Sequence, residues 1–212
     1  MRRLPVYLLL DTSGSMTGEP IEAVKNGVET LLSTLRQDPY ALETAFVSVI
    51  TFDSTARQVV PLTDLLNFKT PNLVASGTTA LGDALSLAAS SIGNEVQKTT
   101  AEKKGDWRPL VFIMTDGSPT DDWRKGVSDF KAARTGIVVA CAAGHGAETK
   151  ILQEITEIVL QLDTADSTSI KAFFKWVSAS ISVGSQKVES GKKDVIGLDD
   201  LPPPPPEVNV VL

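Results

Sequence analysis

Short runs of consecutive apolar residues alternate along this chain with longer stretches in which apolar residues recur every three or four positions. A short continuous apolar run is typical of a strand buried on both faces, and a 3.6-residue period is typical of an amphipathic helix. Strands are therefore expected over residues 6–10, 46–52, 56–62, 110–114, 137–142 and 158–162. Helices are expected over residues 19–36, 79–98, 123–134, 148–155 and 169–181.

This alternation of strands and helices predicts an α/β fold, a doubly wound and mostly parallel sheet with helices on both faces. Residues 46–52 and 56–62 are joined only by a short turn at Asp53 and Ser54, so they form a hairpin that adds one antiparallel edge strand. In sheets of this kind, ligands bind outside the carboxyl ends of the strands. Functional residues are therefore expected directly after the strands.

The chain has 212 residues, which is enough for one domain with a full core. The periodic pattern ends at about Ser182, and five consecutive prolines occupy residues 202–206. Residues 1–183 are therefore expected to form the domain, and residues 184–212 a flexible, proline-rich tail. The proline run favours an extended polyproline II helix, which serves either as a second contact for a partner or as a stiff linker.

The composition excludes several classes of protein. A formal net charge of -6, without a cluster of Lys or Arg, argues against a nucleic-acid partner. No apolar segment is long enough to span a bilayer, so no membrane role is expected. Cys141 is the single cysteine and forms neither an internal disulfide nor a structural zinc site. The first apolar run is too short for a signal peptide, and the expected location is the cytoplasm.

Oxygen-bearing side chains gather after three of the expected elements. Residues 11–15 read Asp-Thr-Ser-Gly-Ser, residues 76–79 read Ser-Gly-Thr-Thr, and residues 115–117 read Thr-Asp-Gly. Alternate residues Asp11, Ser13 and Ser15 converge on one point if the loop curls after the strand. With Asp116 supplying a second carboxylate, this is a ligand set for a hard divalent cation such as magnesium. Such a site leaves one coordination position for an anionic oxygen from another molecule.

These segments, in this order, resemble the metal-ion-dependent adhesion site of von Willebrand factor A (vWA) domains, and the resemblance covers about residues 4–181. It implies a Rossmann-like fold, a divalent ion (magnesium first, manganese or calcium as alternatives), and a protein partner that presents an Asp or Glu carboxylate to the ion. Thr79 is preferred to Thr78 because the Ala-Leu that follows it matches the family pattern. The implied metal ligands are Asp11, Ser13, Ser15, Thr79 and Asp116.

Three segments also resemble the TerY group of bacterial vWA proteins, which are cytosolic and belong to tellurite-resistance and stress-response loci. They are residues 4–16, residues 114–123 (Met-Thr-Asp-Gly-Ser-Pro-Thr-Asp-Asp-Trp) and residues 173–177 (Phe-Phe-Lys-Trp-Val). This resemblance implies a stress-response complex that contains a protein kinase and a PP2C-type phosphatase. Some TerY relatives carry a cysteine-rich zinc module, and the single Cys141 shows that this chain lacks one.

Three alternatives compete with a metal-dependent binding module. A magnesium-dependent phosphatase of the haloacid-dehalogenase type needs a second Asp two residues after the first, where this chain has Ser13. A serine hydrolase needs a base, and the only histidine is His145 in an expected loop. A scaffold with a purely structural ion is the third. The chain is therefore expected not to be an enzyme.

Other conspicuous residues have ordinary structural interpretations. The aromatic residues of the last expected helix and the lone thiol are expected in the core. Trp107 and Trp123 flank the Asp116 strand and are expected to pack in the core, although they could also border the site. Asp121 or Asp122 is expected to cap the helix that follows.

Overall fold

The computed structural model describes residues 2–190 and 198–211, and within them the strands form one seven-stranded sheet. The strand order is β3-β2-β1-β4-β5-β6-β7. Strands β1, β2, β4, β5 and β6 run parallel, and β3 and β7 are antiparallel strands at the two edges. The strands are β1 (Leu4–Asp11), β2 (Ala45–Phe52), β3 (Ala56–Asp64), β4 (Leu110–Thr115), β5 (Val138–Ala143), β6 (Ile158–Leu162) and β7 (Val208–Val211).

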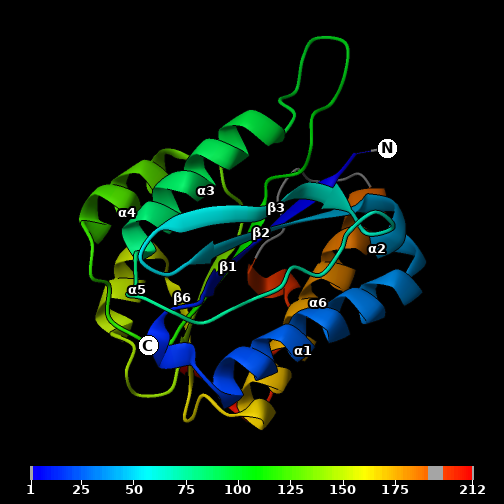
Figure 1. The fold of residues 1–212 in the computed structure, drawn as a ribbon. Helices are drawn as coiled ribbons and strands as arrows, with labels where there is room; N and C mark the ends of the chain where they lie inside the picture. Colours follow the sequence, from blue (N-terminus) through cyan, green and yellow to red (C-terminus); the bar gives the residue numbers. More distant parts are fainter. Residues whose placement is uncertain (1, 191–197, 212) are drawn as a thin grey trace.

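Helices cover both faces of this sheet (Figure 1). One face carries α1 (Glu19–Gln37), α2 (Pro39–Thr44) and α6 (Ser167–Ser190), and the other carries α3 (Leu81–Glu95), α4 (Trp123–Ala132) and α5 (Thr149–Ile155). Two short 3-10 turns, η1 (Gly14–Met16) and η2 (Leu198–Asp200), complete the set. The predicted fold class is therefore confirmed, and β7 adds a second antiparallel edge strand that was not predicted. No helix within the described ranges has both the length and the apolar character to cross a membrane.

Burial explains why the sequence pattern could be read. All eight residues of β1 are buried, which is what a continuous apolar run predicts for a central strand. The aromatic residues Phe173, Phe174 and Trp176 of α6 lie in the core, as expected. Helix α6 approaches α1 closely, because a Cβ atom on Gly27 would lie only 2.3 Å from the Phe174 ring.

The chain after residue 183 differs from the prediction of a flexible tail. The expected domain boundary falls inside α6, which continues to Ser190. Further on, β7 pairs with β6, and Trp176 Nε1 donates a hydrogen bond of 2.8 Å to the Pro202 carbonyl. Val208 is buried, so the end of the chain adds to the core and covers the edge of β6. The tail prediction was wrong for residues 184–190 and 198–211, and its residues 191–197 and 212 lie outside the described residues.

Candidate metal centre

Two neighbouring strands bring the predicted carboxylates to one edge of the sheet. Strands β1 and β4 are parallel neighbours, with Leu10 beside Met114, so Asp11 at the end of β1 and Asp116 directly after β4 lie at the same edge of the sheet. Ser13 Oγ and Ser15 Oγ lie 2.9 Å apart, and Ser15 Oγ donates a 2.6 Å hydrogen bond to Asp116 Oδ1. The loop after β1 therefore curls as expected, and its hydroxyls reach the carboxylate that follows β4.

Asp11 is the most deeply buried member of this group, at 1% exposure. Its Oδ1 accepts a hydrogen bond from the Ser13 amide (2.7 Å), and its Oδ2 accepts one from Thr115 Oγ1 (2.5 Å). Burial raises the pKa of Asp11 and the nearby charge of Asp116 adds to the rise, while the hydrogen bonds from Ser13 and Thr115 oppose it. Thr115 thus orients Asp11, a role that the sequence reasoning missed although Thr115 belongs to the Thr-Asp-Gly motif.

Asp116 is half-buried, and burial raises its pKa against the opposing hydrogen bond from Ser15. In the part of the chain that the structure describes, neither Asp11 nor Asp116 forms an ion pair with a Lys, Arg or His side chain. Two partly desolvated carboxylates without a positive partner are unfavourable neighbours. The arrangement therefore has the charge that a divalent cation would neutralise.

Thr79 joins the group from a loop rather than from a helix, because α3 begins two residues later than predicted. Its side chain is buried, and a Cβ atom on Gly117 would lie 3.4 Å from Thr79 Oγ1 and 3.7 Å from Ser15 Oγ. Thr78 is exposed and directs its hydroxyl to Ser54 Oγ, at 3.4 Å. The structure thus places the Thr79 hydroxyl beside Gly117, as it does the Ser15 hydroxyl, and directs the Thr78 hydroxyl to Ser54.

Backbone hydrogen bonds fix the Thr79 loop on both sides. The Gly14 amide donates to the Gly77 carbonyl (3.0 Å), and Gly77 has the positive φ of 72° that suits glycine. On the other side, the Thr79 amide donates to Thr120 Oγ1 (3.2 Å) and the Thr120 amide donates to the Thr79 carbonyl (2.9 Å). The three loops after β1, before α3 and after β4 therefore hold one another in place.

Of the two residues predicted as the cap of α4, Asp122 takes that role and Asp121 caps a different helix. The Asp121 carboxylate accepts hydrogen bonds from the amides of Gly82 (3.1 Å) and Asp83 (2.8 Å), so it caps α3, whose own N-cap residue, Ala80, offers no side-chain acceptor. Asp122 caps α4 through the Lys125 amide. The loop after β4 thus supplies both Asp116 and the cap that positions the helix behind Thr79.

The donor set fits a hard divalent cation. The clustered side-chain donors are all oxygens, and neighbouring ligands of an octahedral ion with bonds of 2.0–2.1 Å lie about 2.9 Å apart, like the two serine hydroxyls. Within the described residues, no three His, Cys, Asp or Glu side chains are grouped so that they could hold a metal ion. A centre at this position therefore depends on hydroxyl ligands in addition to its two carboxylates.

The remaining candidates lie outside this group. His145 is exposed, and no hydrogen bond joins it to Ser13 or Ser15 in the described part of the chain, so a hydrolase pair is not formed. Trp123 is partly buried, with the Arg124 guanidinium 4.3 Å from its ring centre. Trp107 is buried at the other end of the sheet.

The family model of the von Willebrand factor type A domain matches residues 6–175. The chain belongs to the VWA family. An uncharacterized Synechocystis protein, sll0103, is 33% identical to it over 123 residues, which are 55% of this chain and 26% of that protein. This chain therefore spans about a quarter of that relative's length.

Solved structures share the VWA fold at low sequence identity. A von Willebrand factor type A protein from Catenulispora acidiphila aligns with a TM-score of 0.63 and 18% identity, covering 85% of this chain and 43% of that one. Proximal thread matrix protein 1 from the mussel byssus, described with a zinc-occupied MIDAS motif, aligns with a TM-score of 0.61 and 19% identity, covering 84% and 48%. VWA domains in general are protein-interaction modules that bind divalent metals and depend on them.

Proposed function

We propose that this VWA domain binds a partner protein through a divalent ion held by five side chains. The ligands are Asp11, Ser13, Ser15, Thr79 and Asp116, and the ion accepts a carboxylate oxygen from an Asp or Glu of the partner. One observation carries the proposal: the buried Asp11 and the half-buried Asp116 lie at the carboxyl edge of the sheet with the Ser13, Ser15 and Thr79 hydroxyls near them, and no cation pairs with either carboxylate in the described residues.

The ion would link carboxylates of two proteins, which would otherwise repel each other. Asp11 and Asp116 supply the only negative charges among the five ligands, and the three hydroxyls are weak, neutral donors. The ion therefore stays a strong Lewis acid with an open coordination position, which a carboxylate oxygen of a partner can fill. Magnesium is the proposed ion because all the donors are hard oxygens, with manganese and calcium as alternatives.

We propose a cytoplasmic stress-response complex as the setting, with a protein kinase and a PP2C-type phosphatase as the partners to test first. The support is the resemblance of residues 114–123 and 173–177 to TerY proteins, which also suggests tellurite resistance. The chain itself has no catalytic role in this proposal, because Ser13 occupies the position where a magnesium-dependent phosphatase of the haloacid-dehalogenase type has its second Asp.

The test is binding of the kinase and the phosphatase to the immobilised full chain, in magnesium and in EDTA. We expect binding in magnesium alone, and loss of binding in Ser15→Ala. Ser54→Ala is the matched control, because Ser54 is an exposed loop serine that bonds Thr78 and not the carboxylates. Equal binding in EDTA would show that the ion does not form the contact. Hydrolysis of a phosphomonoester by the metal-loaded chain would instead favour the phosphatase alternative.

A further inference from the structure

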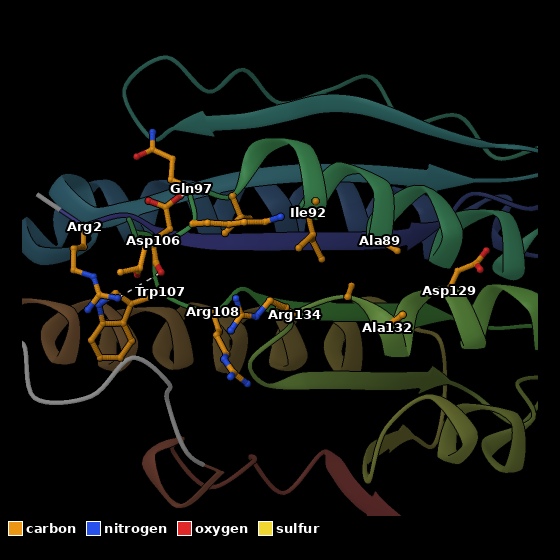
Figure 2. Close-up of a pocket in the computed structure, with 15 residues that line it drawn as sticks. Arg2, Ala89, Ile92, Gln97, Asp106, Trp107, Arg108, Asp129, Ala132 and Arg134 are labelled. Carbon is orange, nitrogen blue, oxygen red and sulfur yellow. Dashed lines mark hydrogen bonds between the residues drawn. The ribbon is translucent and has the colours of Figure 1, made fainter. Parts of the chain in front are cut away.

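A cavity of about 790 Å³ lies at the amino ends of β1 and β4, at the opposite end of the sheet from Asp11 and Asp116 (Figure 2). The last turns of α3 and α4 form two of its walls, and the segments around Lys98 and Arg108 form the others. Its volume lies in the range of about 300–1,000 Å³ that is usual for small-molecule sites. The proposed protein contact at the metal centre does not use this space.

The cavity lining is rich in basic side chains, although the whole chain carries a net charge of -6. Lys98, Arg108 and Arg134 line it, and none of the three forms an ion pair in the parts of the chain that the structure describes. All three are exposed to solvent. Three positive charges around one space are thus left without a protein anion.

The two carboxylates of the lining do not supply that anion, because each is already paired elsewhere. Asp106 accepts hydrogen bonds from Arg3 Nε (3.0 Å) and Arg3 Nη2 (2.5 Å). Asp129 accepts hydrogen bonds from Lys125 Nζ (2.9 Å) and Ser86 Oγ (2.8 Å). Their charges are matched by Arg3 and Lys125, which are not among the residues that line the cavity.

Helix ends explain only part of this positive charge. The C-terminal ends of α3 and α4 border the cavity, and basic residues are favoured near such ends. Each end carries the equivalent of about half a negative charge, so two ends balance about one of the three cations. The excess remains positive, which favours an anion from solution.

Arg108 and Arg134 bring two guanidinium groups to one part of the cavity. The segments that carry them are joined by the hydrogen bond from the Gly136 amide to the Pro109 carbonyl (2.9 Å), and Figure 2 shows the two side chains in the same part of the cavity. Guanidinium groups bind phosphate oxygens through two parallel N–H donors, and two of them around one space suit an anion with several oxygens. A phosphate fits this description better than a single carboxylate.

The rest of the lining is suited to an organic group. Ala89, Ile92, Val96 and Ala133 present an apolar wall along α3 and α4. Trp107 also lines the cavity, although its ring packs in the core on the α6 face of the sheet.

We propose that this cavity binds a small organic phosphate of about nucleotide size. Arg108, Arg134 and Lys98 hold its phosphate oxygens, and its apolar body packs against Ile92 and Val96. The ligand reaches the domain at the end remote from the metal centre, so it can be bound while a partner protein occupies the ion.

The test is isothermal titration of the full chain with ADP, adenosine and inorganic pyrophosphate, all in EDTA so that no metal ion at the Asp11 cluster can bridge to phosphate. We expect saturable binding of ADP, weaker binding of pyrophosphate and no measurable binding of adenosine. Arg108→Ala with Arg134→Ala should weaken ADP binding at least tenfold, because each removes charge-assisted hydrogen bonds. Lys171→Ala with Lys175→Ala, on α6, removes the same charge elsewhere and should leave ADP binding unchanged.

Three results would overturn the proposal. ADP that fails to bind at millimolar concentration shows that the cavity takes no organic phosphate. Equal affinities for ADP and pyrophosphate show that the apolar wall makes no contact with a ligand. An unchanged affinity in the double arginine variant, with Tm within a degree or so of the parent, shows that any binding occurs elsewhere.

Discussion

Two buried carboxylates at opposite ends of the sheet, Asp11 and Asp106, have opposite charge environments. The Asp106 side chain is 3% exposed and is held by the Arg3 guanidinium through both Nε and Nη2. Asp11 is equally buried, but its partners are an amide and a hydroxyl, and the negative charge of another carboxylate, Asp116, adds to the rise of its pKa. A buried charge with a built-in partner is already compensated within the fold. A buried charge without one is suited to an ion that comes from solution.

Of the changes that test this difference between Asp11 and Asp106, Arg3→Ala is expected to have the largest effect on the free energy of unfolding. This change leaves Asp106 buried without a positive partner and also removes the hydrogen bond from Arg3 to the Glu95 carbonyl. Breaking a buried ion pair in this way costs about 3–5 kcal/mol of the free energy of unfolding. Chemical denaturation measures it, and Arg3→Lys should lose less because it keeps the charge. A loss below about 1 kcal/mol would place this pair with ordinary surface salt bridges.

The next effect concerns the metal. Magnesium at a hundredfold excess over its Kd should raise the free energy of unfolding by about 2.7 kcal/mol, and Asp11→Asn should abolish this gain. In EDTA the same variant should be more stable than the parent. The raised pKa of Asp11 means that its charged form opposes folding at neutral pH, and asparagine carries no charge. Thermal unfolding with and without the metal measures both differences, and a parent that responds to magnesium no more than the variant contradicts the assignment.

A third carboxylate, Asp121, tests whether its place in the sheet or its hydrogen-bond partners decide if a carboxylate serves metal binding or stability. It lies at the metal end of the sheet, but like Asp106 it has its own partners, the amides of Gly82 and Asp83. Asp121→Ala should therefore cost about 1–2 kcal/mol of stability, the usual effect of losing a helix cap. It should also weaken metal binding, because α3 begins just after Thr79. Asp122→Ala, which uncaps only α4, is the control and should leave metal affinity unchanged.

The sequence predicted the metal end of the molecule more completely than the other end. Residues 6–10 of the buried strand β1 form a readable apolar run, and parallel neighbouring strands must place Asp11 and Asp116 at one edge. Arg3 and Asp106 are 103 positions apart, and no periodic pattern in the sequence indicates that they pair. The four residues of β7 follow five prolines, so the segment resembled a tail until its pairing with β6 was seen. Local sequence patterns predict helices and strands. They do not predict which residues pair when those residues are far apart in the sequence.

The smallest predicted effect distinguishes two adjacent threonines. Thr79 Oγ1 lies near Ser15 and Gly117, whereas Thr78 Oγ1 points to Ser54, so only Thr79 is placed to reach the ion. Thr79→Ala should raise the magnesium Kd about tenfold, the lower end of the range for residues that support a metal site. Thr79→Ser keeps a hydroxyl and should recover most of the affinity, and Thr78→Ala should change the Kd less than about twofold, since losing one exposed hydroxyl contact has little effect. Calorimetric titration of the three variants measures the order. The reverse order would transfer the ligand role to Thr78 and would mean that the loop before α3 rearranges when the ion binds.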